Sequence, residues 1–307
     1  MVIEKKSMLP PLDDAVAHSQ RFITIVCLAA FLPGLGCYFC VAYSFFFQLD
    51  TVLNFTQSEH CPDVRSAFPP VSYSIGIWKP QRYIWLLILF VHLPPRIIFI
   101  VLYRRLFYTF SHEAKAFEIT LKFYALTLWL EPSGLILVSV IDIKSHFIIH
   151  AIAYAMWIIF FNFNMLLNVI LTHFSGFKQT HPKVVKVWWF KLLMLISGIA
   201  ISISTPFTYF YFLKHCNVVA YTLFSVAECI MVGYNAVFYA LSYYEFPSTR
   251  ITVGVRSKAY IKSRTFSTTS TVQSSTGSNS SYEKDQLPAS KMPLASSEDS
   301  ASAVVFA

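Results

Sequence analysis

The stretch YIWLLILFVHLPPRIIFIVLY, residues 83–103, decides the fold class of this chain. Apart from His92, Arg96 and two prolines it is apolar or aromatic. About 20 such residues in a helix cross the roughly 30 Å hydrocarbon core of a bilayer. The stretch therefore predicts a transmembrane helix.

Five further apolar runs of similar length lie on either side of it. The predicted spans are 22–47, 83–103, 119–141, 147–171, 187–213 and 218–243. This pattern predicts an all-α, polytopic membrane protein with a six-helix domain over residues 22–245. Residues 48–82 form the one long loop inside the domain.

Two terminal segments flank the predicted membrane domain. Residues 1–21 precede the first span, and residues 246–307 form a tail rich in Ser and Thr. The tail cannot bury enough apolar surface to offset the entropy of ordering it, so we expect it to be disordered.

The composition of the whole chain agrees with a membrane protein. The 307 residues have a mean hydropathy of +0.54. Only 13% of them are Asp, Glu, Lys or Arg, whereas a soluble domain carries about a quarter. The net charge of +8 comes from short basic clusters between apolar runs, which indicates membrane topology. We expect membrane lipids as partners and no nucleic acid.

The distribution of Lys and Arg predicts the orientation. These residues concentrate before the first span, around the second and fourth loops (as far as Lys191) and in the tail. The loops on the other side carry only Arg65, Lys79, Arg82, Lys144 and Lys214. Because cytosolic loops are the basic ones, both termini should be cytosolic and the 48–82 loop lumenal.

Cysteines and glycosylation sequons bear on the same question. Cys61 and Cys216 are the two loop cysteines, and both fall on the predicted lumenal side, which is oxidising. A Cys61–Cys216 disulfide is therefore expected, with two free thiols as the alternative. Asn54 begins a sequon on that side, close to the membrane, and is a candidate glycosylation site. Asn279 begins another in the tail and should stay unmodified in the cytosol.

Five ionisable residues lie inside the predicted spans, where each needs a partner or a role. At about 1.5 Å per residue, His92, Glu131 and Glu228 fall at one depth on three helices. Arg96 lies one turn deeper and His150 lies nearer the lumen. We expect one near-neutral cluster. It is either an ion pair of Arg96 with an acid that only holds the bundle together, or a polar pocket that handles a lipid head group.

Motifs of soluble enzymes are missing from the sequence. It has no Walker loop, dinucleotide fingerprint or Gly-x-Ser-x-Gly elbow, and no His, Cys and Asp set with zinc spacing. We predict no metal and no bound cofactor.

Several segments match one known family. They are Cys61–Pro62, Pro69–Gly76, Pro80–Trp85, His92 with Pro95–Arg96, Glu131, Phe147–His150 and Cys216–Glu228. They resemble the post-GPI attachment to proteins factor 2 family over roughly residues 15–246. The Ser-rich tail has no counterpart there and the predicted cytosolic loops are only loosely similar, so the chain looks like a diverged, factor 2-like member.

The resemblance implies work on the lipid of glycosylphosphatidylinositol (GPI) anchors. The family is associated with the step that restores a saturated chain to the lyso-anchor in the Golgi apparatus, and the endoplasmic reticulum is the alternative location. The substrate would be the GPI-anchor lipid, and the acyl donor is unknown. The residues expected to bind its phosphate or inositol are Lys79, Gln81, Arg82 and Arg96.

Two roles stay open under this interpretation. In the first, the protein is an acyltransferase or a subunit of one. His92 or His150 would then be the general base for a glycerol hydroxyl, oriented by Glu131 or Glu228. In the second, it is a non-catalytic lipid-binding or escort protein that supports a separate acyltransferase. A transporter is disfavoured, because the sequence shows no pair of inverted halves.

Overall fold

The computed structural model describes residues 17–55, 58–65, 68–110, 114–247, 249–254 and 303–306. The chain divides into two compact units. One is residues 22–247, and the other combines residues 1–21 with 248–307.

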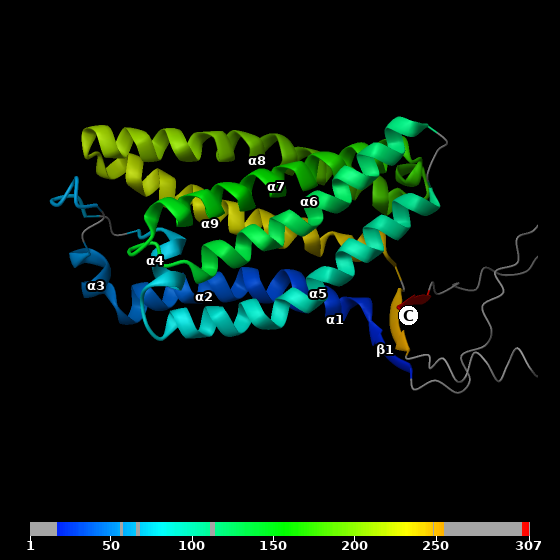
Figure 1. Cartoon of the computed structure of the whole chain (residues 1–307), viewed down its shortest axis with the longest axis horizontal. Coiled ribbons are helices and arrows are strands. Elements are labelled where there is room, and N and C mark those ends of the chain that lie inside the picture. Colours follow the sequence, from blue (N-terminus) through cyan, green and yellow to red (C-terminus); the bar gives the residue numbers. More distant parts are fainter. Residues whose placement is uncertain are drawn as a thin grey trace, which may run out of the picture. The chain divides into compact units, whose positions relative to one another are not determined.

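Residues 22–247 form a helical bundle (Figure 1). Within the described residues, six helices are long and apolar enough to cross a membrane, which confirms the predicted all-α domain of six spans. They are Phe22–Phe47 (α1, η1 and α2), Gln81–Thr109 (α5), Lys115–Val140 (α6), Phe147–Phe174 (α7), Pro182–His215 (α8) and Val218–Glu245 (α9 and α10).

Shorter elements complete the bundle. The first span consists of α1 (Phe22–Val26), a π-helical turn η1 (Cys27–Phe31) and α2 (Leu32–Phe47). The last span consists of α9 (Val218–Ala240) and α10 (Ser242–Glu245). The connections contain α3 (Leu49–Asn54), α4 (Val71–Gly76) and the 3-10 turn η2 (Phe177–Gln179).

Several helices run beyond the predicted spans. Helix α5 continues through Arg104 and Arg105 to Thr109, and α8 begins at Pro182 instead of residue 187. His181 caps α8, because its Nδ1 accepts the backbone N–H of Lys183 at 3.1 Å. The predicted bounds follow the apolar runs, but a helix need not end where its side chains become polar.

The Cys61–Cys216 disulfide is present, which confirms the predicted pairing. The Cα atoms are 5.5 Å apart, and the bond joins the first loop to the turn between α8 and α9. We call this end of the bundle the disulfide end. It also holds α3, α4 and the loop of residues 141–146.

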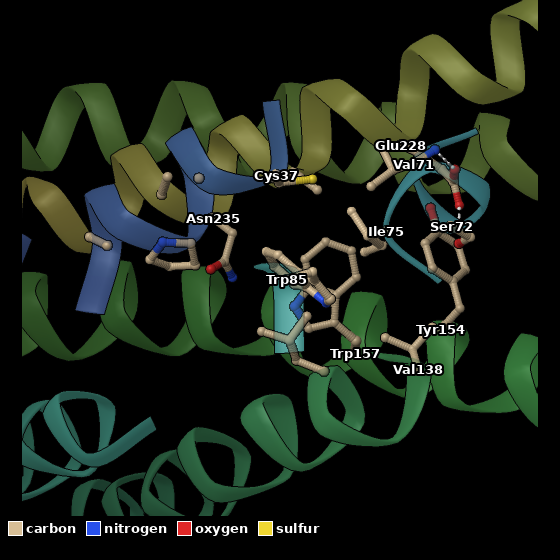
Figure 2. A pocket seen from close by; sticks show the side chains of 16 residues that line it. Cys37, Val71, Ser72, Ile75, Trp85, Val138, Tyr154, Trp157, Glu228 and Asn235 are labelled. Atoms are coloured by element: carbon tan, nitrogen blue, oxygen red, sulfur yellow. Dashed lines mark hydrogen bonds between the residues drawn. The ribbon is translucent and has the colours of Figure 1, made fainter. Parts of the chain in front are cut away.

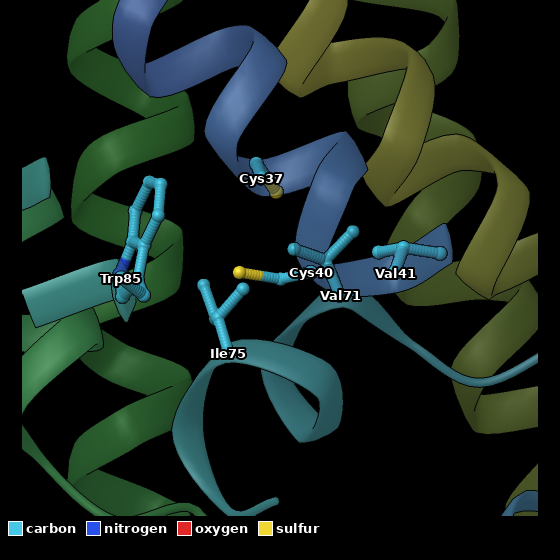
Figure 3. Packing of buried hydrophobic residues seen from close by; sticks show 6 residues of the cluster. All are labelled: Cys37, Cys40, Val41, Val71, Ile75 and Trp85. Carbon is cyan, nitrogen blue, oxygen red and sulfur yellow. The ribbon is translucent and has the colours of Figure 1, made fainter. Parts of the chain in front are cut away.

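Helix α4 is packed into the disulfide end by apolar side chains. Val71 and Ile75 of α4 pack with Cys37 and Cys40 of α2 and Trp85 of α5 (Figure 3). These five side chains are buried, so their removal from water anchors a helix of only six residues. Ser72, which comes between Val71 and Ile75 in the sequence, is thereby held in a fixed place.

Close contact between α6 and α7 depends on one small residue. A Cβ added at Gly134 of α6 would lie 2.7 Å from the backbone nitrogen of Trp157. Glycine at this position lets the two backbones approach, as small residues do at helix interfaces in membranes. The contact places α7, which carries His150, against α6, which carries Glu131.

The second unit contains a three-stranded sheet that was not expected from the sequence. Strand β2 (Arg250–Gly254) pairs antiparallel with β1 (Ala17–Arg21) and parallel with β3 (Ala303–Phe306). Strands β2 and β3 fall within the tail predicted to be disordered. Residues 1–16 and 255–302 lie outside the described residues, and so does Asn279.

Candidate functional site

The five ionisable residues predicted to cluster are all buried. His92, Arg96, Glu131, His150 and Glu228 expose between 0 and 4% of their surface. Hydrogen bonds divide four of them into two groups instead of one. His150 and Glu228 lie in the first group, and Arg96 and Glu131 lie in the second.

The first group is a chain of three side chains from three helices. His150 Nε2 of α7 lies 3.1 Å from Ser72 Oγ of α4, which lies 3.3 Å from Glu228 Oε1 of α9. Glu228 Oε2 also accepts the backbone N–H of Val71 at 2.9 Å. The fixed position of α4 therefore brings the histidine and the carboxylate to opposite sides of one hydroxyl.

The second ring nitrogen of His150 fixes the tautomer. Nδ1 lies 2.9 Å from the carbonyl oxygen of Ile141, which can only accept a hydrogen bond. The proton of the neutral ring is therefore assigned to Nδ1, and Nε2 is left as the acceptor. Ser72 has one hydroxyl proton and donates it to Glu228, so Nε2 keeps a lone pair that can take a proton, as a general base requires.

A cavity of about 450 Å³ opens beside this first group. Its polar end is formed by Ser72, His150 and Glu228, and Tyr73 lies there too. Burial raises the pKa of Tyr73 to about 12, so its phenol stays neutral and can donate a hydrogen bond. The other lining residues are mostly aliphatic and aromatic side chains of α7, α8 and α9. A polar end on an apolar cavity suits an amphiphilic ligand.

A smaller inner cavity of about 50 Å³ lies between the two groups. Figure 2 shows Glu228, bonded to Val71 and Ser72, on one side of it and Asn235 on the other. The indole N–H groups of Trp85 and Trp157 line it and have no partner among the described residues. The volume has room for about three water molecules, which such unpaired donors would bind.

The second group is a buried ion pair between Arg96 of α5 and Glu131 of α6. Glu131 Oε1 pairs with Arg96 and accepts from Asn235 at 2.6 Å. Its Oε2 accepts from Asn164 at 2.6 Å and from Tyr239. The guanidinium of Arg96 also lies 3.4 Å from the centroid of the Tyr239 ring. Four helices are joined in this way, and both Glu131 oxygens are occupied.

His92 belongs to neither group. Its side chain is 1% exposed, and among the described residues neither ring nitrogen has a hydrogen-bond partner from another helix. The catalytic role predicted for His92 stays a prediction.

The three remaining residues predicted to bind substrate lie at the disulfide end in different environments. Gln81 is buried and joins α5 to α2 by donating to Ser44 Oγ at 3.1 Å and Gln48 Oε1 at 2.7 Å. Lys79 is exposed and Arg82 is half-buried. These two cations are therefore free to meet a charged head group in a way that Gln81 is not.

Sequence reasoning did not select Ser72 as a functional residue. Ser72 lies in a short helix within a long loop and not in a span, so the search for polar residues in spans passed over it. The resemblance to a known family included Pro69–Gly76, the segment that holds Ser72, but it did not single out this hydroxyl.

Comparisons with known proteins agree on one family. The family model described as the Frag1/DRAM/Sfk1/Cwh43P N-terminal domain matches residues 22–249. The chain is 26% identical to post-GPI attachment to proteins factor 2 of Drosophila melanogaster, over 80% of this chain and 94% of that protein. It is 24% identical to acyltransferase PGAP2 of Xenopus tropicalis, over 76% and 91% of the two chains.

A third relative is named post-GPI attachment to proteins factor 2-like. The factor 2-like protein of Drosophila melanogaster is 24% identical over 76% of this chain and 72% of its own length. No solved structure matches the chain.

Proposed function

This chain belongs to the Frag1/DRAM/Sfk1/Cwh43 N-terminal domain family, and from that membership we propose that it remodels the lipid of GPI anchors. Relatives named for post-GPI attachment and for acyltransferase activity support the proposal. The specific reaction we propose is transfer of a fatty acyl chain to the free glycerol hydroxyl of the lyso-anchor. The membrane concerned is that of the Golgi apparatus, with the endoplasmic reticulum as the alternative.

The observation that carries this proposal is the His150–Ser72–Glu228 chain at the polar end of an apolar cavity. The lyso-anchor's hydroxyl attacks the carbonyl carbon of an acyl thioester or ester and loses its proton to His150 Nε2. The donor's thiol or alcohol leaves and takes a proton back. Glu228, reached through Ser72, favours the protonated imidazole. Lys79 and Arg82 would meet the anchor's phosphate.

The ion pair has a different role in this proposal. Glu131 and Arg96 already bond to each other and to neutral neighbours, so a substrate would have to displace those bonds. We assign them to holding α5, α6, α7 and α9 together.

The proposal places the disulfide end on the lumenal side, with both termini in the cytosol. The Lys and Arg distribution supports this orientation. The disulfide supports it as well, because such bonds persist in oxidising compartments.

The orientation predicts glycosylation at Asn54 and not at Asn279. Asn54 is exposed at the end of α3, where its Oδ1 accepts from Arg65 Nη1 at 3.0 Å. N-glycosidase treatment should increase the mobility of the wild-type protein on a gel. Asn54→Gln should remove this shift and Asn279→Gln should not. A shift that depends on Asn279 would invert the topology.

The function is tested by the lipids of GPI anchors in cells that lack this protein. Mass spectrometry should show lyso-anchors accumulating and saturated diacyl or alkyl-acyl anchors decreasing. Wild-type protein should restore the normal pattern. An unchanged chain composition in the null cells would contradict the proposal.

A further inference from the structure

The cavity beside His150 does not end at the first group. A second recess of about 420 Å³ lies between α7 and α8 and shares four lining residues with it. The shared residues are Ile158, Ile159, Ser202 and Pro206. We call the continuous hollow the α7–α8 groove.

The two helices touch at one level and separate at another. A Cβ added at Gly198 would lie 3.0 Å from Met165 Cε, and Trp188 Nε1 donates to the Val169 carbonyl at 3.0 Å. These contacts close the groove toward the end opposite the disulfide. Nearer the disulfide end, α8 presents Ser202 and Pro206 to the groove, and side chains this small leave the space unfilled.

The walls of the groove are suited to hydrocarbon. Its second recess is lined mainly by Ile, Leu and Phe side chains, and Ile203 and Phe207 at its rim are exposed. The polar side chains there, Asn162 and Ser202, bond to each other at 2.8 Å. The polar end lies at the other extreme, at His150.

The groove is long enough to hold one lipid chain. From His150 to Phe163 along α7 is about 20 Å at 1.5 Å per residue. Half of a hydrocarbon core is about 15 Å, the depth that one lipid chain covers. A single chain whose polar end lies at His150 therefore fits within the groove before the contact of Met165 with Gly198 closes it.

We propose that the α7–α8 groove binds one long hydrocarbon chain of a lipid whose reacting end lies at His150. The chain belongs either to the acyl donor or to the lyso-lipid acceptor. That the lipid is a remodelling substrate rests on the proposed function, whereas binding of the chain does not. The groove is open along its side, so the chain enters from the bilayer.

The test is photo-crosslinking of the purified full-length protein in nanodiscs. One arm uses lysophosphatidylinositol with a diazirine near the end of its chain, and the other uses acyl-CoA with the same group. Peptide mapping should find labels on residues 158–166 and 199–207 several-fold above those on Ile97 and Val101, which lie at a similar depth. These two residues are exposed on α5 and report ordinary contact with lipid. The arm with the higher ratio identifies the source of the chain.

A matched pair of variants supplies the control. Ser202→Leu fills the junction of the two recesses and should reduce groove labelling several-fold, with α5 labelling unchanged. Ser204→Leu adds the same bulk at an exposed position, where the serine hydroxyl bonds to the Ile201 carbonyl of its own helix. It should leave the labelling of the groove and of α5 unchanged.

Two results are decisive. Equal labelling of the groove and α5 in wild-type protein, in both arms, would overturn the proposal even if Ser202→Leu fails to fold. Groove labelling without any acyl transfer would leave the groove in place and contradict only the proposed function.

Discussion

Replacing His150 by glutamine should lower the rate of acyl transfer to the lyso-anchor by about 100- to 10,000-fold, the usual contribution of a general base. Glutamine cannot take a proton from the attacking hydroxyl, although its amide can still reach polar neighbours. The rate is measured in membranes from null cells that express each variant at equal level, with labelled acyl donor. Glu228→Gln should lower the rate in the same direction by a smaller factor.

Two other histidines make this prediction specific. His146 is exposed one turn before His150 on the same side of the bundle, so His146→Gln should keep the wild-type rate. His92→Ala removes the other histidine predicted as a base. A large loss of rate in folded His92→Ala, with His150→Gln active, would assign the base to His92 and refute the arrangement proposed for the site.

Breaking the buried ion pair should destabilise the protein by about 3–5 kcal/mol. Arg96→Met leaves the Glu131 carboxylate charged and buried, and Glu131→Gln leaves the guanidinium in the same state. The double variant removes both charges, while the introduced amide still meets Asn164 and Tyr239. It should therefore recover most of the loss. Thermal unfolding in detergent measures the coupling between the two sites.

The exposed pair of Glu118 and Lys122 provides the comparison. Its atoms are 2.8 Å apart, but the side chains are 66% and 75% exposed. Lys122→Met should lower the unfolding temperature far less than either single substitution in the buried pair, because water screens exposed charges.

If the double variant at Arg96 and Glu131 were stable but had lost acyl transfer as completely as His150→Gln, the buried pair would take part in the reaction.

The spans were predictable because a bilayer allows few alternatives. A helix that crosses it must be apolar over its whole length, and each of the six runs contains such a stretch. The disulfide was predictable because the predicted topology left only Cys61 and Cys216 in loops on the side expected to be oxidising. The ends of the helices were not predictable, because polar residues such as Arg104 can continue a helix once it has left the hydrocarbon core.

The sequence allowed us to predict which buried ionisable residues belong to the site, but not which of them contact one another. Depth along each helix places Glu131 and Glu228 at one level, but depth does not say which neighbour each side chain faces. Packing decided that Arg96 meets Glu131 and that Glu228 meets Ser72. Lys191, counted from sequence as a charge near a loop, is buried in an ion pair with Glu245 at 2.8 Å. Such pairings depend on helix rotation, which a single sequence does not show.

We expect the chain itself to transfer the acyl group. The most direct measurement is product formation by purified wild-type protein in nanodiscs, supplied with lyso-anchor and a labelled acyl donor. Labelled anchor should form with wild-type protein and should fall to background with His150→Gln. If neither protein forms product while a separate acyltransferase does so in their presence, the chain is an escort and the histidine is not a base.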